Sequence, residues 1–263
     1  MLEITLKLLK KTDMDEYMDK YIELQKGVVL GDVSYKDEII RQTWPELFES
    51  DIVSYAIITK EGADFCGYCA VKNIETDRPE IQIELLRTFR GKGIGFQALY
   101  EMMVEVGERY NISCFIAAVE SDNYASQRLM YKLGGLPGGI RRTIYLNENE
   151  VGSFEKDYID LLNRHMIQVA ADFGVAPQKL LSHVLIFKIQ LAELKKGMCS
   201  QNPCGTIPKT ALMDEQDRKV SIAMRKHKME SIANDVLDIL RKLEKERSDD
   251  AKKEINEYSK EKN

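Results

Sequence analysis

Polar and apolar residues alternate along much of the first 190 residues in the way that β-strands require. Residues 80–86 alternate one by one, which is typical of a strand with one buried face. Residues 114–119 form a short continuous apolar run, which is typical of a strand buried on both faces. Turn-forming residues, such as those at 60–63, separate these runs. Seven strands are predicted, at residues 2–9, 52–59, 64–73, 80–86, 114–119, 140–146 and 184–189.

Apolar residues at helical spacing predict helices between these strands. The expected helices follow Thr12-Asp13, follow Ser34, cover residues 96–110 and begin at Asn123. Aromatic residues of the first two, including the only tryptophan, Trp44, could line a pocket, although core packing is the favoured role. Another helical pattern runs from Phe154 to Phe173 and is ended by Gly174. We interpret residues 150–183 as a helical insertion between the last two strands.

The chain is longer than one ordinary domain, which has roughly 100–200 residues, because it has 263. We expect a folded domain at residues 1–190, a linker at 191–213 and a long helix with a frayed, charged end at 214–263. Apolar residues recur at every seventh position of that helix, at Ile222, Met229, Val236 and Leu243. Such a stripe must be buried, either on the folded domain or in a homodimer through the C-terminal helix.

Composition and charge narrow the classes of partner. The net charge is -5 and the sequence pI about 5.5, which argues against a nucleic-acid partner for the whole protein and favours a cationic or amine substrate. No apolar run approaches the roughly 20 residues that a membrane span needs, so we expect no membrane partner. The first residues lack the apolar segment of a signal peptide, which predicts a cytoplasmic location.

Cysteine and histidine spacing does not predict a metal site. Cys66 and Cys69 have a C-x-x-C spacing but lie within one predicted strand, where residues three apart point to opposite faces, so one of them is expected in the core. Cys199 and Cys204 are expected to be free thiols in a reducing compartment. The three histidines show neither metal-ligand nor triad spacing, and we expect no metal.

A glycine-rich turn, residues 90–95, joins the strand at 80–86 to the following helix. Glycines at alternate positions let the backbone approach a ligand, and the free N–H groups of a helix start attract anions, so the turn predicts a pyrophosphate site. The turn does not match a P-loop, which would need Gly-Lys-Ser/Thr at its end. It matches a dinucleotide-binding fingerprint poorly, because that motif needs another glycine and a later acidic residue, for which Glu120 is a weak candidate. The pattern Arg/Gln-x-x-Gly-x-Gly/Ala fits best, through Arg90, Gly93 and Gly95.

A second motif follows the strand at 114–119. Residues 123–135 read Asn-Tyr-Ala-Ser-Gln-Arg-Leu-Met-Tyr-Lys-Leu-Gly-Gly. Together the two motifs resemble the GNAT superfamily of acetyl-CoA-dependent N-acetyltransferases, and the second is nearest to the branch that acetylates ribosomal-protein N-termini. Its usual closing Gly-Phe is Gly134-Gly135 here. The resemblance implies an α/β (α+β) fold with a mixed, mostly antiparallel central sheet flanked by helices, to which this chain adds the insertion and the helical tail.

The resemblance also implies a co-substrate, acetyl-CoA, and the residues that hold it. The loop residues would bind its pyrophosphate, and backbone groups of Leu85 and Leu86 would bind the pantetheine arm and polarise the thioester. The strand at 114–119 would splay away to open the cleft. Asn123 and Ser126 match positions that often contact the coenzyme. The loop residues are Arg90, Gly91, Lys92, Gly93, Ile94 and Gly95.

Catalysis needs a base, because an alkylamine is largely protonated at neutral pH. Glu80 and Glu84 share one face of their strand, and either could be the base. Glu80 aligns with the base of several family members, whereas Glu84 lies nearer the expected position of the thioester. The thiolate is often protonated by a tyrosine at the position of Met130 in this family. Tyr131 is the next residue, turned by about 100°, and solvent is the alternative acid.

The function that these residues predict is N-acetyl transfer from acetyl-CoA to a primary amine of a small molecule or peptide, by direct transfer with a carboxylate or a water-relayed base. The alternative is a non-catalytic acyl-CoA-binding module that acts in regulation or interaction. The fold does not select the acceptor amine.

Overall fold

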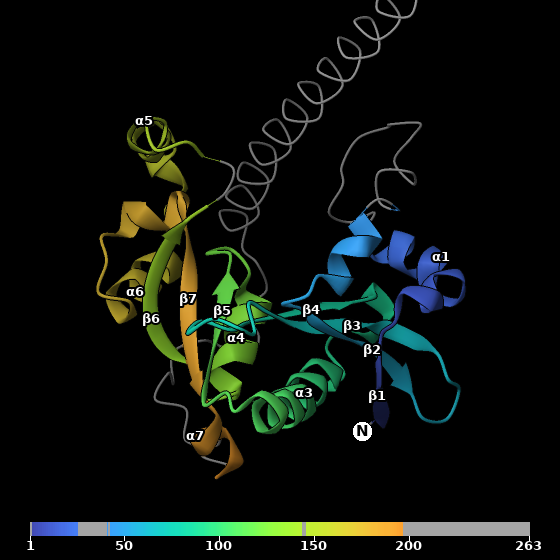
Figure 1. Cartoon of the computed structure of the whole chain (residues 1–263). Helices are drawn as coiled ribbons and strands as arrows, with labels where there is room; N and C mark the ends of the chain where they lie inside the picture. The colour runs from blue at the N-terminus through green and yellow to red at the C-terminus, as the bar shows by residue number, and fades with distance from the viewer. Residues whose placement is uncertain (1, 26–40, 42, 144–145, 197–263) are drawn as a thin grey trace, which may run out of the picture.

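The computed structural model of the chain describes residues 2–25, 41, 43–143 and 146–196. A seven-stranded sheet forms its centre, and helices cover the sheet (Figure 1). The strands are β1 (Ile4–Leu8), β2 (Val53–Thr59), β3 (Phe65–Lys72), β4 (Glu80–Leu85), β5 (Cys114–Val119), β6 (Leu136–Arg142) and β7 (His183–Gln190). The α-helices are α1 (Met14–Gln25), α3 (Ile94–Tyr110), α4 (Tyr124–Lys132), α5 (Val151–Asp157), α6 (Arg164–Asp172) and α7 (Leu191–Lys195). Short 3-10 helices are η1 (Lys11–Asp13), η2 (Trp44–Phe48), η3 (Arg87–Phe89), η4 (Ile159–Leu161) and η5 (Pro177–Leu181).

The sheet is mixed and mostly antiparallel, as the sequence predicted. Its strand order is β1-β2-β3-β4-β5-β7-β6, and only the β4–β5 pair is parallel. That pair is also the weakest, because it consists of one bridge, Glu80 opposite Ile116. The sheet is therefore two half-sheets, β1–β4 and β5-β7-β6, which separate beyond this bridge.

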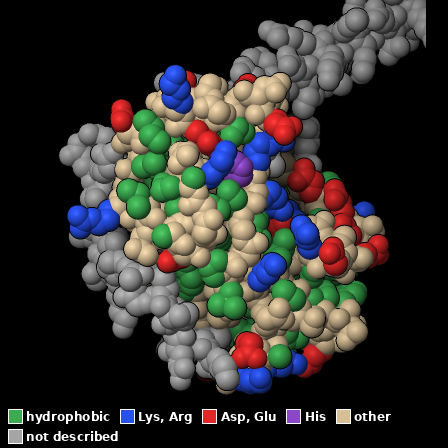
Figure 2. Space-filling view, turned by 90° about the vertical axis from the view of Figure 1, so that its left-hand side faces the viewer, with side chains coloured by type: hydrophobic (Ala, Val, Ile, Leu, Met, Phe, Trp, Pro, Cys, Tyr) green, Lys and Arg blue, Asp and Glu red, His purple; other side chains and the backbone are tan. Residues whose placement is uncertain are grey.

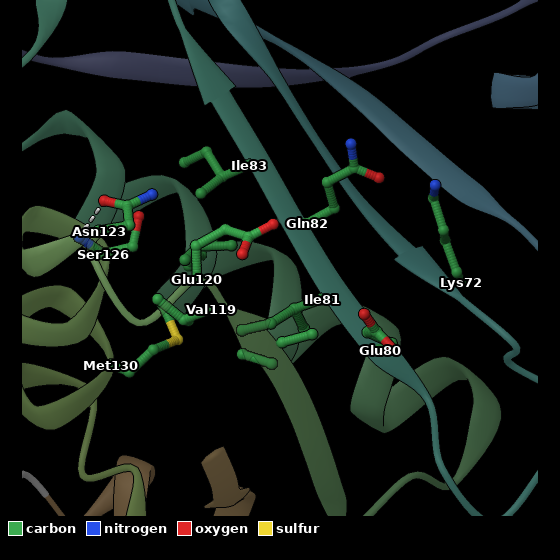
Figure 3. Close-up of a pocket in the computed structure, with 13 residues that line it drawn as sticks. Lys72, Glu80, Ile81, Gln82, Ile83, Val119, Glu120, Asn123, Ser126 and Met130 are labelled. Carbon is green, nitrogen blue, oxygen red and sulfur yellow. Dashed lines mark hydrogen bonds between the residues drawn. The ribbon is translucent and has the colours of Figure 1, made fainter. Parts of the chain in front are cut away.

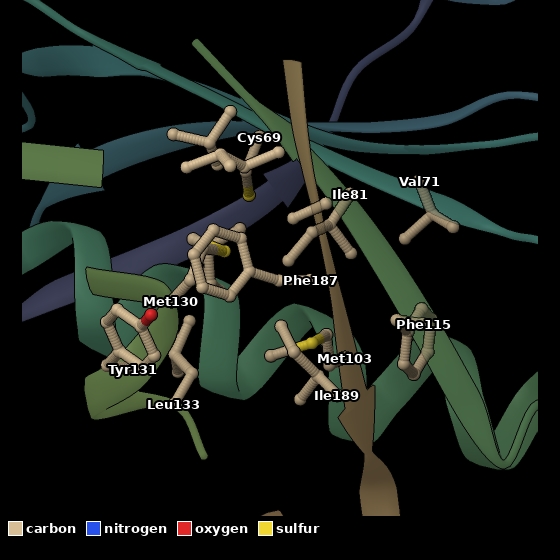
Figure 4. Packing of buried hydrophobic residues seen from close by; sticks show 14 of the residues in the cluster. Cys69, Val71, Ile81, Met103, Phe115, Met130, Tyr131, Leu133, Phe187 and Ile189 are labelled. Carbon is tan, nitrogen blue, oxygen red and sulfur yellow. The ribbon is translucent and has the colours of Figure 1, made fainter. Parts of the chain in front are cut away.

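Two hydrophobic clusters lie on opposite faces of the first half-sheet. The larger one packs α3 against the sheet and continues under the second half-sheet, where Tyr131 and Phe187 meet edge to face at 5.1 Å (Figure 4). The smaller one packs α1 and η2 against the other face. Trp44 is 2% exposed there and meets the ring of Tyr21 edge-on at 5.1 Å, so the core-packing role is confirmed for this residue.

A β-bulge in β3 corrects the prediction for the two cysteines of that strand. Ile57 lies opposite Gly67 but Ile58 lies opposite Phe65, so Cys66 is an extra residue. An extra residue shifts the alternation by one, and residues three apart then share a face. Cys66 and Cys69 are consequently both buried in the larger cluster, where the sequence predicted only one. Gly67 permits the bulge: its φ is 148°, and a Cβ there would lie 2.0 Å from the carbonyl oxygen of Glu84.

The helical segment between β6 and β7 is broken into pieces, whereas the sequence pattern indicated one helix. Asn163 interrupts it, because its side-chain oxygen accepts a hydrogen bond from the N–H of Met166 at 2.8 Å and caps the start of α6. α5 and η4 therefore precede this cap, and η5 follows α6. Gly174, with φ 64°, follows the end of α6, as predicted.

β6 and α7 also differ from the prediction. The strand expected at 140–146 begins at Leu136 and ends at Arg142, and the glycines at 138–139 lie inside it as a bulge, because the register with β7 shifts between Pro137 and Ile140. The predicted linker begins with a helix, α7, whose Leu191 is buried against α3. The folded unit thus extends beyond residue 190.

Several predicted features lie outside the described residues. They are the first part of the helix expected after Ser34, Cys199, Cys204, the linker from residue 197 and the tail helix at 214–263. Within the described ranges, no helix is long and apolar enough to cross a membrane.

Candidate active site

The separation of β4 and β5 creates a cavity of about 290 Å³ (Figure 3). β4 contributes one wall, β5 the other, and α4 closes one end. The glycine-rich turn follows β4 after the short helix η3, so a chain-like ligand that lies along β4 toward its carboxyl end would approach the turn. The lining residues on which the site depends are Gln82, Ile83, Asn123, Ser126 and Met130.

Backbone groups of β4 face this cavity without a strand partner. In an antiparallel pair, alternate residues direct their N–H and C=O groups toward the partner. The N–H of Leu86 donates to the carbonyl of Cys66 at 2.8 Å, so Leu86 faces β3, and the N–H groups of Ile83 and Leu85 face the cleft. The prediction of free backbone groups is therefore corrected for Leu86, whose N–H is paired, and extended to Ile83.

The glycine-rich turn has the backbone shape that the sequence predicted. Gly91 and Gly93 have φ values of 74° and 85°, and Gly93 is the N-cap residue of α3, which begins at Ile94. The first N–H groups of α3 therefore point out of the helix at this end. Gly95 lies close to the side chains of Ile83, Leu85 and Leu129, at 3.4–3.7 Å from the position of a Cβ.

Arg90 and Lys92, the two cationic residues of the turn, differ in the contacts that their side chains make. The Nε of Arg90 donates to the carbonyl oxygen of Leu85 at 2.8 Å, which fixes the side chain against the end of β4. Lys92 is exposed, and its Nζ lies 5.6 Å from the ring centre of Phe89. Lys92 can therefore move toward an anion bound at the turn, whereas Arg90 shapes the turn.

The second motif places its residues on two sides of α4. The side-chain oxygen of Asn123 accepts a hydrogen bond from the N–H of Ser126 at 3.1 Å and so caps the helix, and both residues border the cleft. Met130 also lines the cleft. Tyr131, one residue on, is 7% exposed and packs on Phe187 in the core instead, so the structure does not bring this candidate acid to the cavity.

The side chain of Glu80 forms an ion pair with Arg141 of β6, the strand at the far edge of the sheet. Both of its carboxylate oxygens accept hydrogen bonds from Arg141 of β6, at 2.9 and 3.0 Å. The two N–H donors of one guanidinium therefore occupy both oxygens of this carboxylate. Glu80 lines the cleft, but its lone pairs face Arg141.

Glu84 lies in a mostly buried polar cluster between β4, β3 and α1. Its carboxylate accepts hydrogen bonds from Gln25 at 2.8 Å, and from Tyr68 and Gln82 at 3.3 Å each. Burial raises the pKa of Glu84 above its usual range, and these three hydrogen bonds partly offset the effect. Gln82 lines the cleft, and its side chain donates to the Tyr68 hydroxyl at 2.9 Å as well as to Glu84, so this residue links the cleft wall to Glu84.

Sequence reasoning missed Gln25, Tyr68 and Arg141. Gln25 is 59 positions from Glu84, and Arg141 is 61 positions from Glu80. No motif or local spacing marks them, because their roles arise only when the strands assemble. Among the described residues, no group of three or more His, Cys, Asp or Glu side chains is arranged to hold a metal ion.

Comparison with known proteins identifies similar chains. The family model described as an acetyltransferase (GNAT) domain matches residues 4–135. A protein of Bacillus subtilis (strain 168), named as a "putative" alanine N-acetyltransferase of ribosomal protein bS18, is 30% identical over 105 residues, which are 40% of this chain and 68% of that protein. A solved structure titled "Crystal structure of putative acetyltransferase" is 16% identical, with a TM-score of 0.50; the match covers 74% of this chain and 86% of that one and supports the fold alone.

Proposed function

The chain belongs to the GNAT acetyltransferase family and is therefore an acetyl-transferring enzyme, and we propose that it transfers the acetyl group of acetyl-CoA directly to a primary amine of a peptide or small molecule. The observation that carries this proposal is the cleft between β4 and β5. Unpaired amides of β4 lie along one wall of it, and the glycine turn at the start of α3 lies beyond the end of that strand.

The cleft and the turn together would accommodate the successive parts of acetyl-CoA. The turn from Arg90 to Gly95 would receive the pyrophosphate on backbone N–H groups, with Lys92 adding charge. The N–H groups of Ile83 and Leu85 would hold the pantetheine arm, and the same row of amides would polarise the thioester carbonyl. Asn123 and Ser126 border the other wall and would contact the arm from there.

Glu84 is the residue that we assign as base, with Glu80 as the less suitable carboxylate. The raised pKa of Glu84 suits a group that must take up a proton, whereas both carboxylate oxygens of Glu80 already accept hydrogen bonds from Arg141. The amine nitrogen attacks the thioester carbon, the C–S bond breaks, and the nitrogen loses a proton that passes through water to Glu84. The coenzyme A thiolate takes its proton from solvent, because Met130 occupies the position of the usual acid and Tyr131 lies in the core.

The acceptor that we propose first is the α-amino group of a peptide. The Bacillus subtilis relative is named for an alanine of a ribosomal protein, and that name supports a peptide N-terminus here. An α-amine has a pKa of about 7.7–8.0, so a sizeable fraction is already neutral at physiological pH. A water-relayed carboxylate is sufficient for such a substrate.

A thiol-release assay tests the proposal. The purified chain is mixed with acetyl-CoA and with a peptide that begins with alanine, and the free thiol of coenzyme A is measured. The same peptide with a blocked N-terminus is the matched control, and amino acids and polyamines complete the panel. We expect thiol release with the free peptide and a mass increase at its N-terminus. Acetyl-CoA binding without turnover on any amine would instead favour the non-catalytic module.

A further inference from the structure

The helical insertion contacts residues 121–127, which lead into α4 and form its first turn, through polar contacts that are largely buried. We call these residues the α4 entrance. The face of the molecule seen in Figure 2 carries basic, acidic and hydrophobic side chains intermixed. The inner side of the insertion packs in the hydrophobic core, and three polar contacts there join it to side chains at the α4 entrance. The three residues of the entrance that take part recur at every third position: Ser121, Tyr124 and Gln127.

The first contact uses the residue that begins α6. Asn163 caps α6 with its oxygen, and its Nδ2 donates to the hydroxyl oxygen of Tyr124 at 2.9 Å. Asn163 is 7% exposed and Tyr124 is equally buried. One side chain therefore fixes the start of the insertion helix and the first residue of α4 together.

The second contact is between His165 and Gln127, and its direction can be assigned. The Nε2 of Gln127 donates to the carbonyl oxygens of Ser121 and Glu120, at 2.8 and 3.3 Å, so the side-chain oxygen of Gln127 faces His165. That oxygen only accepts, and therefore the Nε2 of His165, 3.1 Å away, carries the hydrogen. The His165 ring also packs edge-on against Tyr124, with ring centres 4.2 Å apart.

The third contact closes the same junction from η5. The Ser121 hydroxyl, 1% exposed, donates to the carbonyl oxygen of Leu180. The hydrogen bonds of Ser121 and Tyr124 are buried, and that of Gln127 is partly buried. Removing one partner of a buried hydrogen bond leaves the other polar group unsatisfied, which destabilises the fold. Asn123 and Ser126, which border the cleft, lie between these anchored positions in the chain.

We propose that His165 and Asn163 are positioning residues for the coenzyme cleft, which they influence through α4. The insertion sets the orientation of the α4 entrance, and thereby the placement of Asn123 and Ser126 relative to β4. This inference rests on the proposed function, because it assigns the insertion a role in acetyl-CoA binding. An insertion that served only to cover the core would not need polar contacts to three residues of this entrance.

The test removes single hydrogen bonds and keeps the packing. His165→Phe retains a ring against Tyr124 but has no donor for Gln127, and Tyr124→Phe removes only the hydroxyl that Asn163 contacts. We expect acetyl-CoA affinity, measured by calorimetry, to fall about threefold to tenfold in each, the range that one hydrogen bond accounts for. KM for acetyl-CoA should rise while KM for the amine stays unchanged. His165→Gln, which restores an N–H donor, should recover most of the affinity.

Gln168→Ala on the same helix is the control, because the Gln168 side chain donates to Asp172 on the exposed side of α6, away from the α4 entrance. Circular dichroism at the assay temperature establishes that each variant is folded. If the His165→Phe variant does not fold, the Tyr124→Phe variant alone decides the test. Wild-type protein that fails to bind acetyl-CoA would overturn the proposed function itself. Wild-type protein that binds, with both variants binding equally well, would overturn only the positioning role.

Discussion

Arg141 of β6 holds the carboxylate of Glu80 of β4 with two hydrogen bonds, although β7 and β5 lie between these strands in the sheet. The contact joins the two half-sheets directly. It lies beside the single bridge through which β4 and β5 pair, since that bridge also uses Glu80. The separation of the half-sheets is therefore limited by a side-chain pair as well as by the backbone.

A double-mutant cycle should detect this link as a free energy of coupling. With Glu80→Gln, Arg141→Met and the double variant, denaturant unfolding should give a coupling of about 0.5–1 kcal/mol, because the pair is bidentate but Arg141 is half-exposed. The coupling should shrink in about 1 M salt, which screens exposed charges. A coupling of zero would show that the pair does not hold the half-sheets together.

Turnover should depend on Glu84 more than on Glu80. Glu84→Gln is expected to lower kcat by about 10²-fold at neutral pH, within the range for a lost general base, while calorimetry shows unchanged affinity for acetyl-CoA. The deficit should shrink near pH ~9, where the amine loses its proton unaided. Glu80→Gln is the matched variant from the same strand face and should stay within a few-fold of wild type. The reverse order of the two variants would assign the base to Glu80.

The same substitution should stabilise the protein at neutral pH. Because burial raises the folded-state pKa of Glu84, the folded state binds this proton more tightly than the unfolded state, and stability falls as pH rises from about 4.5 through the folded pKa. Glu84→Gln carries no such charge, so its melting temperature should exceed that of wild type at neutral pH. The difference should diminish as pH falls toward about 4. A lower melting temperature at neutral pH would indicate that the three hydrogen bonds outweigh desolvation.

The glycine turn can be tested against a glycine of similar conformation elsewhere. Gly91 and Gly174 have φ values of 74° and 64°, and a Cβ added at either glycine would meet nothing within 4 Å. Valine at either position should therefore impose a similar backbone strain of about 1–3 kcal/mol. Only Gly91→Val should weaken acetyl-CoA binding, measured by calorimetry, because only that Cβ would lie where phosphates approach. Equal loss of affinity in both variants would attribute the effect to stability alone.

The strands were largely predictable because their alternation is local. Glu80–Leu85 and Cys114–Val119 match the predicted runs almost residue for residue, and the order of elements follows. The bulges were not predictable from alternation, because an extra residue such as Cys66 changes the phase without changing the composition. The break before α6 depends on the Asn163 cap, which the apolar spacing on either side concealed.

The backbone around the proposed coenzyme site was more predictable from the sequence than the partners of the two candidate carboxylates. The turn at Gly91 and Gly93 and the helix start next to Asn123 are local features, and both were predicted from the sequence. The difference between Glu80 and Glu84 was not accessible, because it is determined by partners about sixty positions away, Arg141 and Gln25. The sequence identified both carboxylates as candidates but did not indicate which of them forms an ion pair with an arginine.

The position of β7 has a consequence for synthesis of the protein. β7 is the last strand of the described chain, yet it lies between β5 and β6, and β6 has no other sheet neighbour among the described strands. The roughly forty residues between β6 and β7 must be made first, which takes about 2–8 s at usual elongation rates. During that interval β6 has no partner strand on either side. A ribosome that stalls within the insertion would therefore leave an aggregation-prone nascent chain with an unpaired strand, a natural client for chaperones.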